Sequence, residues 1–216
     1  FGEERVPESP DSMQGAFLGP EYLNIDVERS LRKFKPIYEE LTEPELYTKV
    51  AQVLDEGNVV GWFQGKMEFG PRALGGRSII ADPRRIDMQK KLNLKIKYRE
   101  SFRPFAPSVL AEDASSYFDL KGNSPYMLLV QPINEERREE LPSNYFELPL
   151  REKLAVKRSE LPAITHIDFS ARVQTVHKDT NPRYWNLINA FKERTGCSMV
   201  INTSFNVRGE PIVCTP

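Results

Sequence analysis

The stretch GWFQGKMEFGPRALGGRSIIA, residues 61–81, sets three cationic side chains among five glycines and a proline, between two apolar runs. The three cations are Lys66, Arg72 and Arg77. Glycine lets backbone N–H groups approach a ligand closely, and guanidinium groups bind phosphate or carboxylate through a planar fork of donors. The flanking runs, Val59–Phe63 and Ser78–Ala81, predict strands. The loop is therefore expected at strand ends, where ligands of α/β proteins usually bind.

An ordinary turn with solvated charges is the alternative for such a loop. Glu68 is the only acid between Gly61 and Asp82 that could neutralise the three cations locally, which favours an anion pocket. The loop matches neither GxxxxGK[ST] nor GxGxxG, so the sequence does not support a standard nucleotide-binding fold.

Composition bounds the class of protein. The 216 residues, 39% of them hydrophobic, suffice for one large domain, or a domain plus an extension. A net charge of −1 produces no overall electrostatic attraction to nucleic acid or anionic membranes, so any recognition of anions must come from a local cluster of cations. The chain has no apolar run near the roughly 18 residues that span a bilayer, and no signal peptide. Its two cysteines, Cys197 and Cys214, lack metal-site spacing and are expected to be buried thiols. These features predict a cytoplasmic protein.

The chain divides into an extension and a domain. Residues 1–36 are rich in Pro, Gly, Ser and Glu without periodicity, which predicts an extended linker or an arm lying on another domain. Because the chain begins at Phe1 without Met and stops at Ile212–Pro216, we expect a piece of a longer protein. Residues 37–216 are predicted to form an α/β domain, a twisted mixed sheet flanked by helices, with a peripheral loop and helix insertion at about 134–160.

Capping signals predict three helices. Thr42 with Glu45 forms a capping box for a helix at Glu43–Glu56, and Asn181-Pro182 starts a helix at Pro182–Arg194. Asp82-Pro83 predicts a helix start, with Ile86, Leu92 and Ile96 on one face. Further strands are expected at Ser108–Ala111, Tyr126–Pro132, Arg172–Val176, Met199–Asn202 and Pro211–Val213.

Two more segments predict the same kind of site. In SFRPFAP, residues 101–107, two prolines stiffen the backbone around Arg103. In INTSFNVRG, residues 201–209, a strand end is followed by uncharged donors and acceptors suited to phosphate, ribose or a carbonyl group. These residues are Asn202, Thr203, Ser204 and Asn206. The alternative for them is a turn with side-chain-to-backbone bonds.

Both histidines of the chain lie in one segment. In HIDFSARVQTVH, residues 166–177, a His-x-Asp pair can be interpreted as metal ligands or as a proton relay, but the alternating pattern favours a strand with structural histidines. The sequence shows no Ser–His–Asp order, HExxH or cysteine cluster, so we expect no metal site. The chemistry is expected to be positioning and charge stabilisation.

Four segments carry a resemblance: GWFQGKMEFGPRALGGRSIIADPR, ESFRPFAPSVL, DFSARVQTV and NTSFNVRGEPIVCTP. Their order resembles the C-terminal region of the O-carbamoyltransferases of the nodulation and antibiotic-biosynthesis type, and they cover most of Gly61–Pro216. In that family a metal-binding amino-terminal domain, related to the universal tRNA-threonylcarbamoylation enzyme, precedes a domain similar to threonylcarbamoyl-adenylate synthase. The resemblance implies that this chain holds the second domain with that fold, and that the missing amino-terminal domain is its partner. One departure is Phe169, where an Asp-Gly-Thr-Ala-Arg run would have glycine.

The resemblance also implies a reaction. Carbamoyl phosphate and ATP, with Mg²⁺ accompanying the nucleotide, would give a carbamoyl adenylate here, and the other domain would pass the carbamoyl group to a hydroxyl of a small acceptor. Lys66, Arg72, Arg77 and Arg103 suit the catalytic role, because clustered cations offset the repulsion between two anions. Ser204 and Asn206 match a Ser-x-Asn element that resembles the nucleotide-contacting motif of the synthase, with Asn202 and Thr203 beside it. The fragment alone is expected not to carbamoylate an acceptor.

Two other classes of function stay open. A non-catalytic module of the same fold could bind nucleotide, or double-stranded RNA through Lys90, Lys91, Lys95, Lys97 and Arg99, although the net charge disfavours nucleic acid. A purely structural partner of the missing domain would bind no ligand. A homodimer is also left open.

Overall fold

A six-stranded mixed sheet forms the centre of the computed structural model, which describes residues 12–216. Its order is β1-β2-β6-β3-β5-β4, and all neighbours are antiparallel except β3 and β5, which are parallel. The predicted α/β class with a mixed sheet is confirmed. The strands are β1 (Val60–Phe63), β2 (Arg77–Ala81), β3 (Ala106–Leu110), β4 (Leu129–Pro132), β5 (Ser170–Val176) and β6 (Met199–Ser204).

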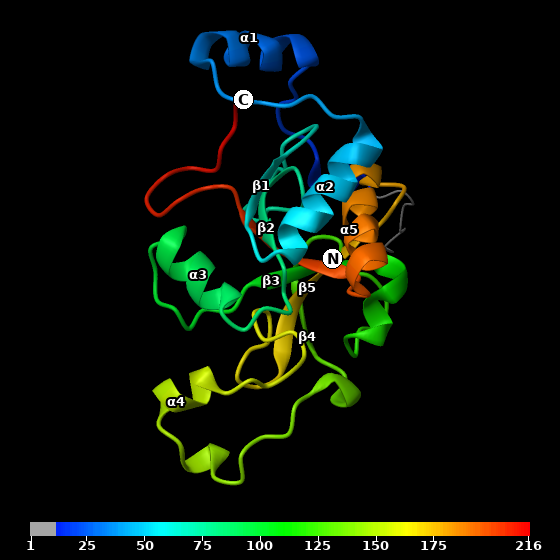
Figure 1. Cartoon of the computed structure of the whole chain (residues 1–216). Coiled ribbons are helices and arrows are strands. Elements are labelled where there is room, and N and C mark those ends of the chain that lie inside the picture. The colour runs from blue at the N-terminus through cyan, green and yellow to red at the C-terminus, as the bar shows by residue number, and fades with distance from the viewer. Residues whose placement is uncertain (1–11) are drawn as a thin grey trace, which may run out of the picture.

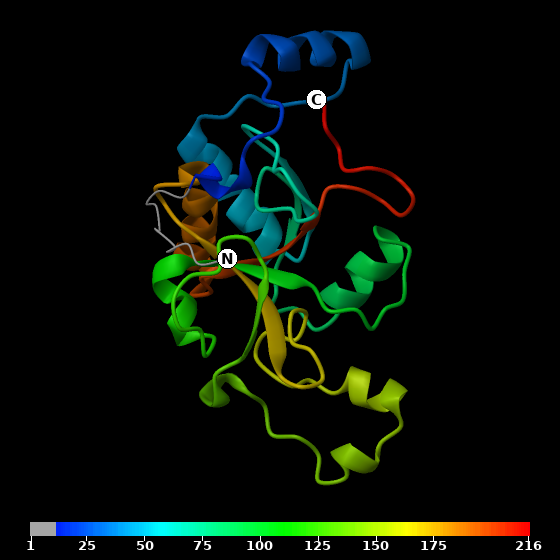
Figure 2. The same ribbon diagram turned by 180° about the vertical axis from the view of Figure 1, so that it is seen from behind.

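Helices flank this sheet. Figures 1 and 2 show α2 and α5 side by side against it, α1 standing at one end of the molecule, and the segment with α4 at the other. The helices are α1 (Asn24–Phe34), α2 (Glu43–Asp55), α3 (Met88–Lys95), α4 (Leu150–Ala155) and α5 (Pro182–Thr195). Short 3₁₀ turns lie at Gln14–Ala16, Ala111–Ser116, Glu135–Arg137 and Tyr145–Glu147.

Caps explain the limits of α2 and α5. Glu45 accepts hydrogen bonds from the Thr42 backbone N–H at 2.9 Å and from its hydroxyl at 2.6 Å, which fixes the first turn of α2. The Asn181 side chain accepts from the Tyr184 N–H at the start of α5, and Gly196 ends that helix at φ +77°. Both predicted helices are confirmed to within a residue.

The helix predicted to start at Asp82-Pro83 begins at Met88 instead. Asp82 does not cap a helix, because its carboxylate accepts from the backbone N–H and the Nε of Arg84, each at 2.9 Å. Ile86 is 62% exposed, so it does not share the buried face of Leu92.

Two predicted strands also differ. Pro211–Val213 is irregular, and its Val213 N–H donates to the Phe205 carbonyl without forming a strand. The strand predicted from Tyr126 begins only at Leu129, since Met127 turns the chain at φ +53°.

The prediction that residues before 37 lack regular structure is wrong for α1. That helix has no buried residue, and apolar side chains of this region such as Leu23 and Phe34 are exposed. The part of the predicted linker at residues 1–11 lies outside the described residues. Cys214 is exposed, contrary to expectation, whereas Cys197 is buried and burial raises the pKa of its thiol to about 12.

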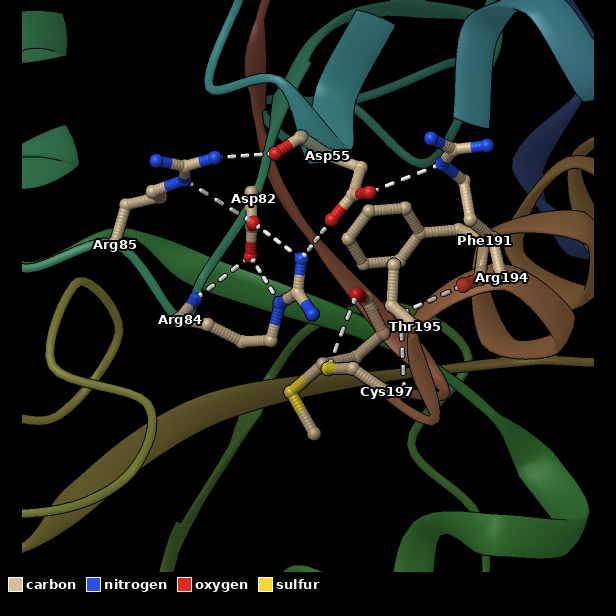
Figure 3. Close-up of polar contacts among 9 residues, drawn as sticks. Asp55, Asp82, Arg84, Arg85, Phe191, Arg194, Thr195 and Cys197 are labelled. Carbon is tan, nitrogen blue, oxygen red and sulfur yellow. Dashed lines mark hydrogen bonds and ion pairs between the residues drawn. The ribbon is translucent and has the colours of Figure 1, made fainter. Parts of the chain in front are cut away.

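A charge network joins the C-terminal ends of α2 and α5 to the end of β2 (Figure 3). Arg84 donates to Asp82 and, at 2.7 Å, to Asp55 at the end of α2. Asp55 also accepts from Arg194 of α5 at 3.0 Å. Arg84 first, and then Arg194, hold the pKa of Asp55 below its usual value. The network ties both helices to the sheet edge.

Among residues 12–216, no helix is long and apolar enough to cross a bilayer.

Candidate functional site: two adjoining cationic pockets

The glycine-rich loop between β1 and β2 is organised by its own acid. The Glu68 carboxylate accepts from the backbone N–H groups of Leu74 at 2.7 Å, Gly76 at 2.6 Å and Arg77 at 3.1 Å. These amides are the ones expected to approach an anionic ligand, and Glu68 already satisfies them. The loop therefore presents side chains, and not these three N–H groups, to a ligand.

Arg77 is also part of this internal organisation. It is 0% exposed, and its guanidinium donates to the carbonyls of Gln64 at 2.8 Å and Gly76 at 2.9 Å and lies 3.5 Å from the centre of the Phe63 ring. Burial lowers its pKa. Arg77 lines none of the pockets described below, so the structure does not place it with the other predicted site residues.

Lys66 lies elsewhere. It lines a pocket of about 430 Å³ together with Gln64 and Asn181, at the start of α5. The structure therefore separates Lys66 from Arg72 and Arg103.

Six predicted site residues do come together, around two adjoining pockets. The smaller, the Asn202 pocket, has a volume of about 190 Å³ and the larger, the Asn206 pocket, about 310 Å³; both include Arg99, Thr203 and Ser204. The Asn202 pocket adds Arg72, Arg172 and Asn202. The Asn206 pocket adds Lys97, Glu100, Arg103, Asn206 and Arg208.

Sheet register explains how distant segments meet in the Asn202 pocket. Side chains two residues apart on a strand share a face, so Arg172 lies on the face of Gln174, and Ser204 on that of Asn202. Ser108 pairs with Gln174 on β5 and with Val200 on β6, so these three side chains lie on one face of the sheet. By the same spacing of two, Arg172, Asn202 and Ser204 lie on that face as well. Arg72 reaches the same place from the loop, which covers this face through Ala73 and Leu74.

Lys97 holds the turn that follows β6. Its ammonium donates to the Ser204 carbonyl at 2.5 Å, to the Asn206 carbonyl at 2.9 Å and to Asn206 Oδ1 at 3.0 Å. The Ser204 hydroxyl donates to Asn206 Oδ1 at 2.6 Å. Part of the Ser-x-Asn element is thus a turn with internal bonds, as the alternative interpretation expected, and it also lines a pocket.

Asn93 of α3 organises the segment that carries Arg99 and Arg103. Buried Asn93 donates from Nδ2 to the Arg103 carbonyl at 2.8 Å and accepts on Oδ1 from Arg99 Nε at 2.6 Å. Arg103 pairs with Glu100 at 3.1 Å. The stiff SFRPFAP segment is therefore fixed by a neighbouring helix as well as by its prolines.

The pockets hold an excess of positive charge. Six cationic residues line them, and Glu100 is the one acid among their lining residues in the described part of the chain. Burial first, and then a neighbouring cation, lowers the pKa of three of them: Arg172 beside Arg72, Arg99 beside Arg103, and Lys97, whose pKa falls to about 8, beside Arg99. The cations repel one another, and an anionic ligand would relieve that repulsion.

Sequence reasoning missed Lys97, Arg99, Arg172 and Arg208 as pocket residues. Lys97 and Arg99 belong to the basic run that the sequence offers only as an RNA-binding surface. Arg172 was placed on a strand, and its spacing of two from buried Gln174 was the signal that could have placed it on the pocket face.

The histidines lie outside these two pockets. His166 Nδ1 is 3.0 Å from Asp168 Oδ1, and the Ser170 hydroxyl donates to the same oxygen at 2.6 Å. Phe169, the departure from the glycine of the family pattern, adopts φ +63°, the left-handed region that glycine favours. Between residues 12 and 216, no group of three His, Cys, Asp or Glu residues could hold a metal ion.

Comparison with known proteins shows which family contains the residues of these pockets. The family described as Carbamoyltransferase C-terminus matches residues 51–216, which include every residue of both pockets. The chain belongs to this family. Nodulation protein NolNO of Sinorhizobium fredii is 46% identical over 78% of this chain and 22% of its own length. The 3'-hydroxymethylcephem-O-carbamoyltransferase of Amycolatopsis lactamdurans is 36% identical over 80% of this chain and 29% of its own length.

A third relative, Uncharacterized protein sll1178 of Synechocystis, is 57% identical over 99% of this chain and 35% of its own length. This carbamoyltransferase C-terminus thus spans about a third or less of the length of these relatives. The resemblance to the nodulation and antibiotic-biosynthesis carbamoyltransferases is confirmed.

Proposed function

We propose that this carbamoyltransferase C-terminus binds carbamoyl phosphate and ATP in the two cationic pockets and forms a carbamoyl adenylate. A further domain of a longer polypeptide would pass the carbamoyl group to a hydroxyl of a small acceptor. The observation that carries the proposal is the set of six cationic residues that line the two adjoining pockets with one acid among them. Such an arrangement favours two anions held side by side, and ATP and carbamoyl phosphate are two anions.

The reaction balances with one water molecule. Water cleaves carbamoyl phosphate to carbamate and inorganic phosphate. A carbamate oxygen then attacks the α-phosphorus of ATP, the bond from that phosphorus to the bridging oxygen breaks, and pyrophosphate leaves. The product is the mixed anhydride of carbamate and AMP. Negative charge accumulates at the transferring phosphoryl group, where fixed guanidinium groups stabilise it without reorganising.

We assign the smaller Asn202 pocket to carbamoyl phosphate and the larger Asn206 pocket to phosphates of the nucleotide. A volume of about 190 Å³ is below the range of roughly 300 Å³ and more that drug-sized ligands occupy. Arg99 lines both pockets, so it could contact both anions. Arg72 and Arg172 would orient the first anion, and Lys97 and Arg103 the second.

Mg²⁺ would accompany ATP through the phosphates of the nucleotide. The described residues supply no cage for it, since Glu100 is the one acid of the two pockets and it pairs with Arg103. A substrate pair of ATP and carbamoyl phosphate is in keeping with a cytoplasmic location.

Calorimetry of the chain with ATP, with carbamoyl phosphate and with both tests the proposal. Each ligand should bind, and pyrophosphate should appear only when both are present. Arg72→Ala should weaken carbamoyl phosphate binding by about 10- to 100-fold, because a charge-assisted hydrogen bond contributes about 1.5–3 kcal/mol. Lys66→Ala is the matched control, since Lys66 lines a different pocket, and it should bind both ligands as the wild type does. Absence of binding by either ligand, alone or jointly, would refute the proposal.

The RNA-binding alternative receives less support. Lys97 and Arg99 line the Asn206 pocket, and Lys91 donates to the Gly57 carbonyl at 2.7 Å, so three of the five residues of the predicted basic patch are engaged. Titration of double-stranded RNA at two salt concentrations separates the alternatives. Tight binding with a steep salt slope would favour the RNA module.

A further inference from the structure

We propose that Asn202 selects the carbamoyl group, by accepting a hydrogen bond on Oδ1 from the nitrogen that distinguishes carbamoyl phosphate from other acyl phosphates. The inference rests on the proposed function and adds to it a residue that discriminates between substrates. It follows from the orientation of one buried amide and from the atoms left unpaired around it.

The orientation of the Asn202 amide is fixed by a chain of hydrogen bonds across three strands. It begins at the backbone carbonyl of Leu74, which can only accept, so the atom of Gln174 at 2.9 Å from it must be Nε2. Gln174 Oε1 therefore faces the other way and accepts from Asn202 Nδ2 at 2.9 Å. Asn202 Nδ2 also donates to the Ala73 carbonyl at 2.9 Å. Both Nδ2 partners are acceptors, so the remaining atom of the amide must be the oxygen.

Within residues 12–216, that oxygen has no hydrogen-bond partner. Asn202 is 1% exposed, it lines the Asn202 pocket, and Oδ1 is a buried atom without a hydrogen bond. Buried polar atoms are nearly always paired, so an unpaired carbonyl oxygen on a residue that lines a pocket calls for a donor from a ligand. Among the residues that line this pocket, Arg72 Nε and Arg172 Nε are likewise buried without partners.

The three unpaired atoms restrict the chemistry of the ligand. The two arginine nitrogens need acceptors, and the asparagine oxygen needs a donor. A ligand that satisfies all three is a small anion that also carries an N–H or O–H group. Carbamoyl phosphate offers phosphate and carbonyl oxygens on one side and an NH₂ group on the other. Acetyl phosphate has nearly the same size and charge, but a methyl group stands in place of NH₂.

The discrimination follows from desolvation. Carbamoyl phosphate pairs Asn202 Oδ1, whereas acetyl phosphate covers it with a methyl group and leaves it unpaired and out of water. Sites that hydrogen-bond a polar substrate group reject the analogue that lacks it for this reason. We expect the wild-type chain to bind carbamoyl phosphate about 10- to 100-fold more tightly than acetyl phosphate.

The test compares dissociation constants of carbamoyl phosphate, acetyl phosphate and ATP by calorimetry on the wild-type chain and on Asn202→Ala. In the variant, the affinity for carbamoyl phosphate should fall about 10- to 100-fold while the affinity for acetyl phosphate changes little. The ratio of the two dissociation constants should therefore approach one. Arg72→Ala should weaken the binding of both acyl phosphates and leave the ratio of their dissociation constants unchanged. Ser108→Ala is the control for the network, because Ser108 donates to Gln174 Oε1 but does not line the pocket.

Each outcome decides the inference. A ratio near one in the wild type, which needs no variant to fold, overturns the selectivity of Asn202, and binding of carbamoyl phosphate would then leave the proposed function standing. Equal weakening of both acyl phosphates by Asn202→Ala overturns it in favour of a structural role. Loss of ATP affinity with an unchanged ratio assigns Asn202 to the nucleotide and overturns it too. If neither carbamoyl phosphate nor ATP binds, the proposed function itself fails.

Discussion

At Lys97, a buried ammonium group joins two roles. It holds the Ser204–Asn206 turn through four oxygen atoms, and it belongs to the row of cations that lines the Asn206 pocket. Burial, and then the charge of Arg99, lowers its pKa from 10.5 to about 8. The charge on this side chain therefore depends on pH near neutrality, unlike that of an ordinary lysine.

Lys97 gives the first pH prediction. Below pH 8 its side chain is protonated and attracts anions, and above pH 8 the charge is lost. ATP affinity should therefore fall as pH rises through about 8, by at most about tenfold per pH unit. Calorimetry on either side of this pH measures the step. Lys97→Met should bind more weakly and without the step, and Lys90→Met, on the exposed face of α3, should titrate as the wild type does. A step that persists in Lys97→Met would assign it to another group.

At the residue scale, the sequence proposes some of the residues that the structure brings together. Arg72, Arg103, Asn202, Thr203, Ser204 and Asn206 line the two pockets. Arg77 has the same local signal as Arg72, because both lie in one glycine-rich loop, but only the folded loop shows that backbone carbonyls occupy the Arg77 guanidinium. Lys97 was missed because a run of lysines on a helix resembles a solvated face, and its burial depends on a turn about 100 residues later.

Among the elements, α2 and α5 depend on charge at their C-terminal ends. Asp55 lies between Arg84 and Arg194, and two arginines on one carboxylate join the helices to each other and to the end of β2 (Figure 3). The Arg84 and Asp55 side chains are each 32% exposed, whereas that of Arg194 is 43% exposed, so the Arg84 pair should contribute more to stability than the more exposed Arg194 pair.

The test at this scale is Asp55→Asn. The free energy of unfolding at neutral pH should fall by about 1–3 kcal/mol, because a charged acceptor for two arginines is lost. The folded state lowers the pKa of Asp55, so its contribution is present above the unfolded value of 3.8 and is lost as pH falls through the lower, folded value. Urea denaturation across the acid range should show the two proteins converge below pH 3.8. Asp119→Asn, at an exposed position, should match the wild type; a constant difference at all pH values would contradict this account.

Local capping rules predicted the elements whose ends are set locally. Thr42 with Glu45, and Asn181 with Gly196, gave α2 and α5 nearly to the residue. The rules failed where a side chain had a tertiary or neighbouring partner, as at Asp82, whose carboxylate binds Arg84 instead of capping a helix. They also missed α1, whose N-cap position is Leu23, a residue that does not signal a helix start.

For the whole molecule, the order of the strands brings the site together. Chain order would place β3 next to β2, but β6 lies between them. The Asn202–Asn206 segment thereby comes between the loop that carries Arg72 and the segment that carries Arg103. Nothing in the local sequence of β6 encodes that position, so the composition of the site could be predicted in part and its assembly could not.

The segment at residues 140–157 should be dispensable for binding. It lies at the end of the molecule away from α1 (Figures 1 and 2), and Tyr145 is its one buried residue. Its ends are close, since the Glu139 N–H donates to the Arg158 carbonyl at 2.8 Å. Replacing the segment with two glycines should keep ATP and carbamoyl phosphate affinities within about twofold and lower the melting temperature by about 4–8 °C, because Arg158 loses two carbonyl partners.

Circular dichroism melting and calorimetry on the same sample check this outcome. Loss of a cooperative transition would show that the segment is part of the core. Weaker ligand binding by a variant that still melts cooperatively would show that the segment reaches the pockets.

The carboxylate of Glu68 has a consequence for the kinetics of the site. Since it already accepts hydrogen bonds from amides of the glycine-rich loop, the loop needs no ligand to become ordered, and Arg72 already lines the pocket proposed for carbamoyl phosphate. Ligand binding therefore carries no entropic cost of ordering that loop. Association should be governed by diffusion and by the attraction of the surrounding cations, with a rate constant that falls as salt concentration rises and no slow folding phase after the encounter.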